Sequence, residues 1–395
     1  MLIEIILFLF LGITAGTITG LIPGVHINLI GAFLISLSAS FLFSISSVYL
    51  VVFISSMAIT HTFLDFIPSI FLGCPDTDTE LSVLPGHELL KKGQGYEAIM
   101  LTAYGSLAAI IILLVITLPA IRIISWGYEI IKNFIPYLLI LISIILILLE
   151  KKKFSAFFVL LITGILGLIV LNLEINEPLL PLLTGLFGGS MLVLSIKNKT
   201  KIPEQKIAKI PRPKIIMPLL GALIASPLCS FLPGMGSGQA AIIGNIISKA
   251  DRKGFLVLLG ATNTLVMGFS FISLYVISKA RTGAAFAVKE IIKVISLNIL
   301  GLILITITLS GIIAFFLTKK LAKIFSTKIN KINYTLLSLI TLFILISLVA
   351  LISGLFGLIV LIISTATGIL SISFKVKRVN MMGCLLLPVI VLYLL

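Results

Sequence analysis

The feature that most constrains this chain is a series of long apolar runs that recurs along its whole length. Runs of roughly 17–25 apolar residues are long enough to cross the ~30 Å hydrocarbon layer of a bilayer as helices. Only 11% of the 395 residues are charged and 59% are hydrophobic, whereas a soluble domain carries about 25% charged residues. The sequence therefore predicts an all-α, polytopic membrane protein of about ten to twelve transmembrane helices.

The net charge of +15 is carried by basic residues in short loops between the apolar runs. This distribution is typical of the cytoplasmic side of a membrane protein, so we expect a multi-pass protein of the cell membrane and no nucleic acid partner. The first apolar run holds Glu4 and no basic residue near its start. We therefore interpret it as a membrane helix and not as a signal peptide.

A basic segment divides the chain close to its middle. From Lys197 to Lys214 the sequence holds seven basic residues, one acid and three prolines. Such a segment is neither a membrane span nor part of a packed core. We predict a cytoplasmic linker over residues 197–213, between a first membrane repeat at 1–196 and a second at 214–395.

Each half is expected to end in three plain apolar helices. Loop charge puts the lysines at 151–153 and at 319–331 inside and the acidic turn at 174–177 outside. The same three-helix unit then starts from opposite faces, which indicates two inverted-topology repeats. The expected helices are 134–149, 154–171 and 179–196 in the first half, and 334–352, 355–374 and 381–395 in the second.

Two Pro-Gly pairs stand at corresponding places in the halves, Pro23-Gly24 and Pro233-Gly234, 210 residues apart. Further on, Thr60-His61-Thr62 answers to Thr262-Asn263-Thr264 with an offset of 202 residues. Pro-Gly breaks a helix and frees backbone polar groups, which in lipid must be buried in protein or line a cavity. Broken or re-entrant helices at equivalent points of two repeats favour a transport site near the membrane midplane.

Polar residues close to these breaks are the candidates for binding a solute. The glycine-rich run at 234–238 exposes backbone amides, and a plain flexible loop is the alternative interpretation. Polar side chains in apolar segments also have a structural interpretation, as hydrogen bonds between helices. The predicted solute-binding residues are Pro23, Gly24, His26, Asn28, Pro233, Gly234, Gly236, Ser237, Gly238, Gln239 and Asn263.

Candidates for ion coupling lie in the first half. The segment at 73–80 alternates acids and threonines, whose hard oxygens suit Na⁺ or a divalent cation, although an exposed acidic turn explains it equally well. His61 and Asp65, four residues apart, suit either a proton relay or a structural hydrogen bond. We expect no resident metal or cofactor, only Na⁺ or H⁺ as coupling ion, with Asp65, Asp76, Thr77, Asp78 and Thr79 as candidates.

Gly12, Gly16, Gly20 and Gly24 are spaced four apart and share one helix face. A ridge without side chains allows a second helix to approach closely. We predict helix packing for this ridge in preference to ligand contact.

The ordered motifs resemble the TctA family, the large membrane subunit of tripartite tricarboxylate transporters. The resemblance rests on Gly16-x3-Gly20-x2-Pro23-Gly24, the threonine stretch, Pro75-Asp76-Thr77, the segment at 85–99 and the second Pro-Gly. The chain reads Pro85-Gly86-His87-Glu88 where the family commonly has Asp-Gly-Tyr-Pro. The resemblance implies anion uptake with a capturing binding protein and a small membrane subunit.

Three functions fit these observations. The leading hypothesis is a secondary transporter that moves a small carboxylate- or phosphate-bearing solute by alternating access. An alternative is recycling of a polyprenyl-phosphate lipid, with the phosphate held at helix N-termini. An intramembrane hydrolase or lipid-modifying enzyme is a third, for which His26, His61, Asp65, His87 and Glu88 are the available groups; we expect no enzyme. A homodimer is left open.

Overall fold

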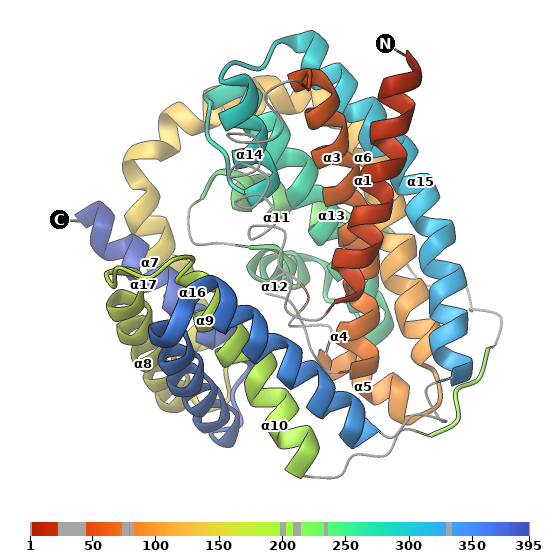
Figure 1. Cartoon of the computed structure of the whole chain (residues 1–395). Coiled ribbons are helices and arrows are strands. Elements are labelled where there is room, and N and C mark those ends of the chain that lie inside the picture. Colours follow the sequence, from red (N-terminus) through yellow and green to blue (C-terminus); the bar gives the residue numbers. More distant parts are fainter. Residues whose placement is uncertain are drawn as a thin grey trace.

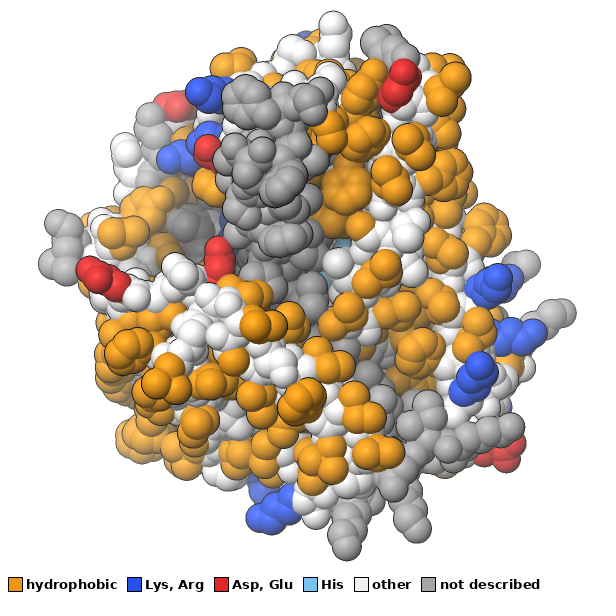
Figure 2. All heavy atoms as spheres, in the orientation of Figure 1, with side chains coloured by type: hydrophobic (Ala, Val, Ile, Leu, Met, Phe, Trp, Pro, Cys, Tyr) orange, Lys and Arg blue, Asp and Glu red, His pale blue; other side chains and the backbone are white. Residues whose placement is uncertain are grey.

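The computed structural model describes residues 2–22, 45–72, 79, 83–197, 203–207, 215–232, 236–328 and 334–394, and its regular elements there are all helices. Eight of these helices are long and apolar enough to cross a membrane, and three shorter apolar helices accompany them. Figure 2 shows apolar side chains over most of the visible surface, with Lys and Arg in a few clusters. The predicted class, a polytopic membrane protein of helices, is confirmed.

The described part of the first half contains eleven elements from α1 to α10 (Figure 1). Ten of them are α1 Leu2–Leu21, α3 Ser47–Leu64, α4 Phe66–Leu72, α5 Val83–Lys91, α6 Gly95–Ile131, α7 Ile135–Leu148, α8 Lys153–Leu171, α9 Leu179–Leu183, the π-helix η3 Thr184–Gly189 and α10 Ser190–Lys197. The eleventh, a 3₁₀ turn at Lys132–Phe134, joins α6 to α7, and α9, η3 and α10 form one continuous span.

The second half repeats this order. Its elements are α11 Ile216–Phe231, α12 Ser237–Ser248, α13 Arg252–Ile277, α14 Gly283–Ile292, α15 Leu297–Lys328, α16 Tyr334–Ser373, the 3₁₀ helix η5 Arg378–Met382 and α17 Gly383–Leu394. Counting from each start, α11 corresponds to α1, α13 to α3 and α4, α14 to α5, and α15 to α6. α11 ends at Phe231 and α12 begins at Ser237; both Pro-Gly pairs lie outside the described residues.

The six terminal helices lie within about two residues of their predicted ends. α16 is one apolar stretch, but Gly354 inside it has φ 66° and ψ −160°, outside the helical region. Only glycine adopts such a conformation readily. Gly354 therefore divides α16 into the two helices that the sequence predicts at 334–352 and 355–374.

The glycine ridge of α1 packs against α3, as predicted. A Cβ at Gly12 would meet Ser56 and the Phe53 carbonyl, one at Gly16 would meet Met57 and Thr60, and one at Gly20 would meet His61 and Leu64. The contacts advance four residues at a time on both helices, so α1 and α3 run parallel. Ring stacking of Phe8 on Tyr49, with centroids 5.5 Å apart, continues the same register.

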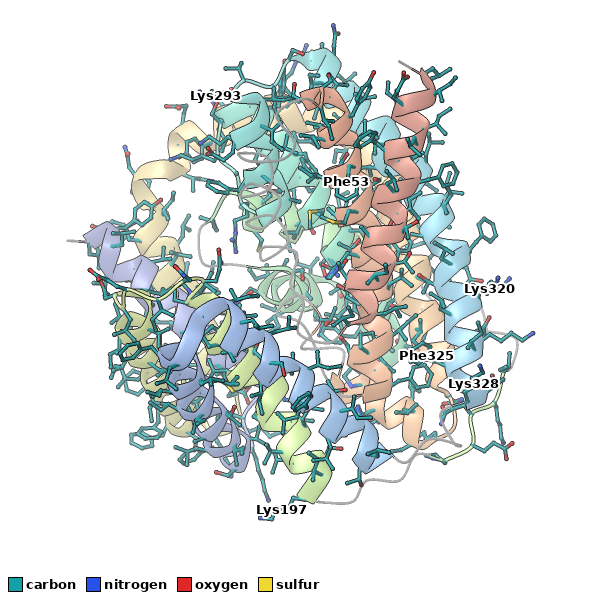
Figure 3. All side chains as sticks on the ribbon, viewed as in Figure 1. Phe53, Lys197, Lys293, Lys320, Phe325 and Lys328 are labelled. Carbon is teal, nitrogen blue, oxygen red and sulfur yellow. The ribbon has the colours of Figure 1, made fainter. Side chains whose placement is uncertain are left out.

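Equivalent helices of the two halves run in opposite directions. In Figure 3, Lys293 lies at one end of the molecule and Lys328 and Lys197 at the other, so α15 runs toward the start of the basic linker. α6 begins at that same end, because Gln205 of the linker binds the amide of Gly95. The inverted arrangement predicted from loop charge is thus present in the fold.

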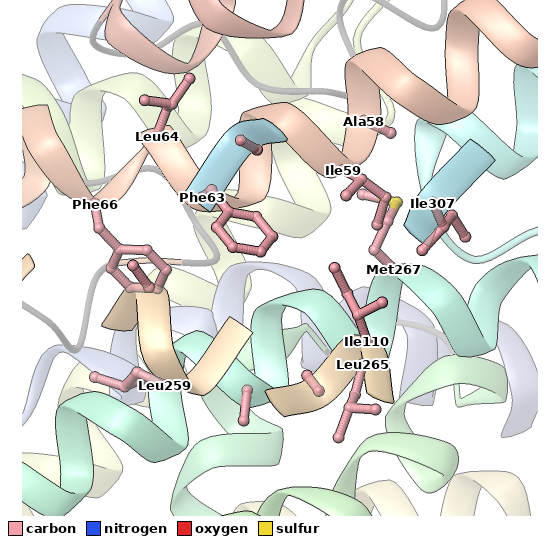
Figure 4. Close-up of a cluster of buried hydrophobic side chains, with 14 of the residues drawn as sticks. Ala58, Ile59, Phe63, Leu64, Phe66, Ile110, Leu259, Leu265, Met267 and Ile307 are labelled. Atoms are coloured by element: carbon pink, nitrogen blue, oxygen red, sulfur yellow. The ribbon is translucent and has the colours of Figure 1, made fainter. Parts of the chain in front are cut away.

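The buried helix of each half packs on the long helix of the other half, α3 on α15 and α13 on α6. α6 and α13 approach closely enough that a Cβ at Gly105 would clash with the Val257 carbonyl, and one at Gly260 with the Thr102 carbonyl. Figure 4 shows Phe63, Ile110 and Leu265 at the centre of the resulting core. We call α1, α3–α6, α11 and α13–α15 the crossed bundle.

The terminal helices form a second group, the terminal bundle, which comprises α7–α10, α16 and α17. Its halves also exchange partners, since α8 packs on α17 and α16 packs on η3 and α10. The tetrapeptide Thr-Gly-Ile-Leu occurs at 163–166 in α8 and at 367–370 in α16. A Cβ at Gly164 would meet Leu387 of α17, and one at Gly368 would meet the Leu186 carbonyl of η3, so the repeat is preserved in packing.

α12 lies between the two bundles and appears nearly end-on in the middle of Figure 1. Its neighbouring residues Ala240 and Ala241 belong to different hydrophobic clusters, Ala240 to that of the terminal bundle and Ala241 to that of the crossed bundle. In α11, Ala222 and Ala225 divide in the same way. The helix after the second Pro-Gly pair therefore connects both bodies of the molecule.

The linker is held more tightly than its composition suggests. Residues 203–207 form no regular secondary structure, and the side chain of Gln205 is buried. Its Oε1 accepts from the Gly95 amide at 2.8 Å, and its Nε2 donates to the Leu90 carbonyl at 3.0 Å. Gln205 is therefore buried within the predicted linker, because its long amide side chain caps the start of α6.

Candidate functional site

The Thr-x-Thr motif of the first half ends at a break between α3 and α4. Asp65 forms the break, and its amide still donates to the His61 carbonyl at 3.0 Å. Pro68 has no N–H to offer the Leu64 carbonyl and its ring crowds that carbonyl, which accounts for the interruption. The break turns a buried carboxylate, 4% exposed, toward the second half of the chain.

Asp65 meets Asn263 of α13. Nδ2 of Asn263 donates to Oδ2 of Asp65 at 2.8 Å and reaches the Thr62 carbonyl at 3.4 Å. The hydroxyls of Thr62 and Thr264 are also 3.4 Å apart. The two Thr-x-Thr motifs, predicted as equivalents, therefore lie in contact where α3 and α13 cross, and all four side chains are buried.

His61 takes a different direction from Asp65. Its Nδ1 lies 3.1 Å from the Thr19 hydroxyl of α1, and the ring is 3% exposed. This contact supports the structural interpretation of His61, a link between the parallel helices α1 and α3. The contact between Asp65 and Asn263 spans the halves, whereas the contact of His61 stays inside one half.

The start of α12 brings together the polar residues that follow the second Pro-Gly pair. Gly236 precedes the helix, and its amide donates to Oε1 of Gln239 at 2.8 Å. Ser237 is 1% exposed and Gln239 is fully buried. Nε2 of Gln239 has no hydrogen-bond partner among the described residues. The half-buried Gly236 and the buried Ser237, Gly238 and Gln239 thus form one helix end between the two bundles.

Thr79 has a partner in α4. Its hydroxyl lies 2.6 Å from that of Ser69, which also donates to the Asp65 carbonyl at 2.7 Å. Ser270 of α13 stands in the equivalent position and contacts the Thr282 hydroxyl at 3.1 Å. Each serine anchors the loop that leaves its helix, so both halves support a structural role for this pair of contacts.

Several predicted site residues lie outside the described residues, and their predictions stay predictions. They are Pro23, Gly24, His26, Asn28, Asp76, Thr77, Asp78, Pro233 and Gly234.

Three of the groups considered for catalysis contact different residues in the described part of the chain, and His26 lies outside that part. Glu88 pairs with Arg252, His61 contacts Thr19, and Asp65 binds Asn263. Burial, together with the positive charges of Lys91 and Arg378, lowers the pKa of His87 to about 4. Within the described residues, no three His, Cys, Asp or Glu side chains are grouped as metal ligands.

Three residues that make polar contacts in this part of the fold were not predicted from the sequence. Ser69 and Ser270 carry the two loop contacts, and their offset of 201 residues is one less than that of the Thr-x-Thr motifs. Lys253 at the start of α13 pairs with the mostly buried Glu97 of α6 at 2.6 Å. An acid and a base near the starts of two apolar helices were visible in the sequence, but their pairing was not.

The fold and the site define a multi-pass membrane protein of two inverted halves, whose buried polar residues meet between helices from both. The comparisons give the family. The chain matches the model of the tripartite tricarboxylate transporter TctA family over residues 6–383. The protein belongs to the TctA family, as the motifs predicted, and is a component of a transport system.

A relative from the archaeon Methanocaldococcus jannaschii, "Uncharacterized protein MJ1079", is 33% identical over 335 residues. The match covers 82% of each chain, so the similarity extends across both halves. No solved structure matches the chain.

Proposed function

We propose that the protein is a secondary transporter that moves a small anionic solute across the membrane by alternating access. The observation that carries the proposal is the hydrogen bond between Asp65 and Asn263, which joins the two inverted halves within buried helices. A carboxylate inside an apolar helix is costly and marks an ion or substrate pathway. Family membership supports a di- or tricarboxylate as the solute.

The two bundles supply the moving parts in this proposal. Most buried apolar residues of each bundle belong to one hydrophobic cluster, and α11 and α12 contribute to both clusters. Leu192 and Leu345 of the terminal bundle lie in the cluster of the crossed bundle, and Val266 of α13 lies in that of the terminal bundle. A change in the angle between the bundles would open one side of α12 and then the other. Because the halves are inverted, the outward-open and inward-open states would be related by the same symmetry that relates the two halves.

Asp65 is the proposed coupling residue, with Na⁺ or H⁺ as the coupling ion. Its partner Asn263 is neutral, so the carboxylate can exchange a proton or a cation without breaking an ion pair to that partner. The binding protein and the small membrane subunit of the tripartite systems are the proposed partners. The linker at 197–213 is proposed to face the cytoplasm; its first residue, Lys197, lies at the same end of the molecule as Lys328 (Figure 3).

Transport by reconstituted vesicles tests the proposal. Purified protein in liposomes should accumulate labelled citrate or succinate under an inward Na⁺ or proton gradient, and an ionophore that collapses the gradient should abolish accumulation. Asp65→Asn should lose gradient-driven accumulation. Uptake of all carboxylates equal to that of protein-free liposomes, under either gradient, would contradict the proposal; translocation of a labelled prenyl phosphate instead would favour lipid recycling.

A further inference from the structure

The start of α12 differs in chemistry from the starts of its neighbours. Asp251 caps α13 by accepting from the Gly254 amide at 2.8 Å, and Thr282 caps α14 by accepting from the Ala285 amide at 3.3 Å. The corresponding residue of α12 is Gly236, which has no side chain to accept from the first amides, although the side chain of Gln239 turns back to accept from the Gly236 amide. A helix start normally carries Ser, Thr, Asp or Asn to satisfy its free amides.

The first backbone hydrogen bond of α12 runs from Ala240 to the Gly236 carbonyl, at 3.2 Å. The amides of Gly238 and Gln239 precede it and therefore have no acceptor within the helix. Both residues are buried, so bulk water does not replace the missing cap. Buried amides without an acceptor are unfavourable unless another group accepts from them.

Gln239 adds a second, independent donor at the same place. Its Oε1 is bound to the Gly236 amide, which turns the side-chain amide back over the start of the helix. Nε2, fully buried, is then a donor without a described acceptor. Backbone and side-chain donors at this helix end thus converge on a position that an acceptor should occupy.

From this geometry we propose that the N-terminus of α12 binds one carboxylate group of the transported solute, with Gln239 Nε2 and the first amides of the helix as donors. The inference rests on the proposed function and names the solute's binding group. A helix end carries about half a positive charge, which suits one negative charge better than the two of a phosphate. A carboxylate also has two oxygens, enough to accept from both the side chain and the backbone.

The test is the thermal stabilisation of the purified full-length protein by sodium citrate, succinate or acetate. Sodium chloride of equal ionic strength and inorganic phosphate serve as the comparison arms. A ligand that binds only the folded state raises the melting temperature by mass action. The wild type should be stabilised by the carboxylates more than by phosphate or chloride.

Two variants locate the carboxylate. Gly236→Ser supplies the missing cap, so it should fold at least as stably as the wild type and yet compete for the amides. Gln239→Glu places a negative charge against the ligand. Each should weaken citrate binding by roughly ten- to a hundredfold, the effect of losing a hydrogen bond to a charged group. Gln94→Glu, in the turn before α6, should bind citrate as the wild type does.

The outcomes separate this inference from the proposed function. If citrate raises the melting temperatures of Gly236→Ser and Gln239→Glu as much as that of the wild type, the assignment of the carboxylate to α12 is overturned. The proposed transport function is not contradicted by that result. Equal stabilisation by phosphate would overturn the choice of carboxylate. If citrate, succinate and acetate all leave the wild type unchanged, the carboxylate solute itself is contradicted.

Discussion

Oδ2 of Asp65 and Nδ2 of Asn263 are 2.8 Å apart, although the residues are 198 positions apart in the chain. Asp65 stands at the break between α3 and α4, and Asn263 near the middle of α13. The two helices belong to opposite halves and run in opposite directions. This hydrogen bond therefore forms only when the two halves are packed against each other.

Removing the side-chain amide of Asn263 should lower the stability of the folded protein. Asn263→Ala leaves Asp65 Oδ2 without its donor in a buried site, and we expect a loss of about 1–3 kcal/mol in stability. Asn298→Ala, an exposed amide at the start of α15, is the matched control and should change stability little. Thermal unfolding in detergent measures both. Equal melting temperatures for Asn263→Ala and the wild type would show that the bond does not hold the halves together.

Two ion pairs at the linker end should differ in strength. Lys253 and Glu97 have side chains 35% and 10% exposed, whereas those of Arg252 and Glu88 are 67% and 36% exposed. A double-mutant cycle on Lys253 and Glu97 should give a coupling of about 1–3 kcal/mol. The cycle on Arg252 and Glu88 should give about 0–1 kcal/mol, since exposed pairs are screened by solvent. The reverse order would contradict the packing of α13 on α6.

The close crossing of α6 and α13 should not tolerate a methyl group. Gly105→Ala and Gly260→Ala each place a Cβ against the partner's backbone, which cannot move aside as a side chain can. We expect each to cost about 1–3 kcal/mol by overpacking. Gly301→Ala is the control, because nothing lies within 4 Å of its Cβ; helix propensity there favours alanine by up to about 1 kcal/mol. Neutral behaviour at Gly105 and Gly260 would exclude the crossing.

His87 predicts how stability depends on pH. Its pKa falls from an ordinary 6.5 to about 4 in the folded chain, mainly through burial. The unfolded chain then takes up a proton in a range where the folded chain does not. Stability contributed by the neutral ring is complete above pH 6.5 and declines as the pH falls from 6.5 toward 4. Melting temperatures across this range should flatten in His87→Asn, and an unchanged slope in that variant would contradict the burial of His87.

Much of the fold was predictable because lipid imposes simple requirements. Apolar runs of the right length, bounded by lysines and prolines, gave the six terminal helices and their direction. The boundary between the helices predicted at 334–352 and 355–374 coincides with the non-helical Gly354. The glycines of α1 likewise have few uses other than close packing.

Other features depend on partners that a single sequence does not specify. Many apolar helix faces have similar composition, so composition does not predict that α8 packs on α17. The shapes of the two helix faces determine this pairing. The acidic segment at 73–80 and the residues after Pro23 were predicted as site residues because polar side chains stand out in an apolar chain. Ser69 and Ser270 do not stand out in this way, since their roles depend on which loop residue each one contacts. The role of Gln205 was not predicted because the residue lies in a basic linker. Its buried hydrogen bonds depend on its position beside the start of α6.

Counterflow tests the central claim most directly. Vesicles containing the protein and loaded with unlabelled citrate are diluted into labelled citrate without any ion gradient. A carrier that exposes one site alternately to each side should show a transient accumulation of label above equilibrium, and Asn263→Ala should reduce its rate. A monotonic approach to equilibrium in the wild type, or no citrate entry beyond protein-free vesicles, would contradict the account.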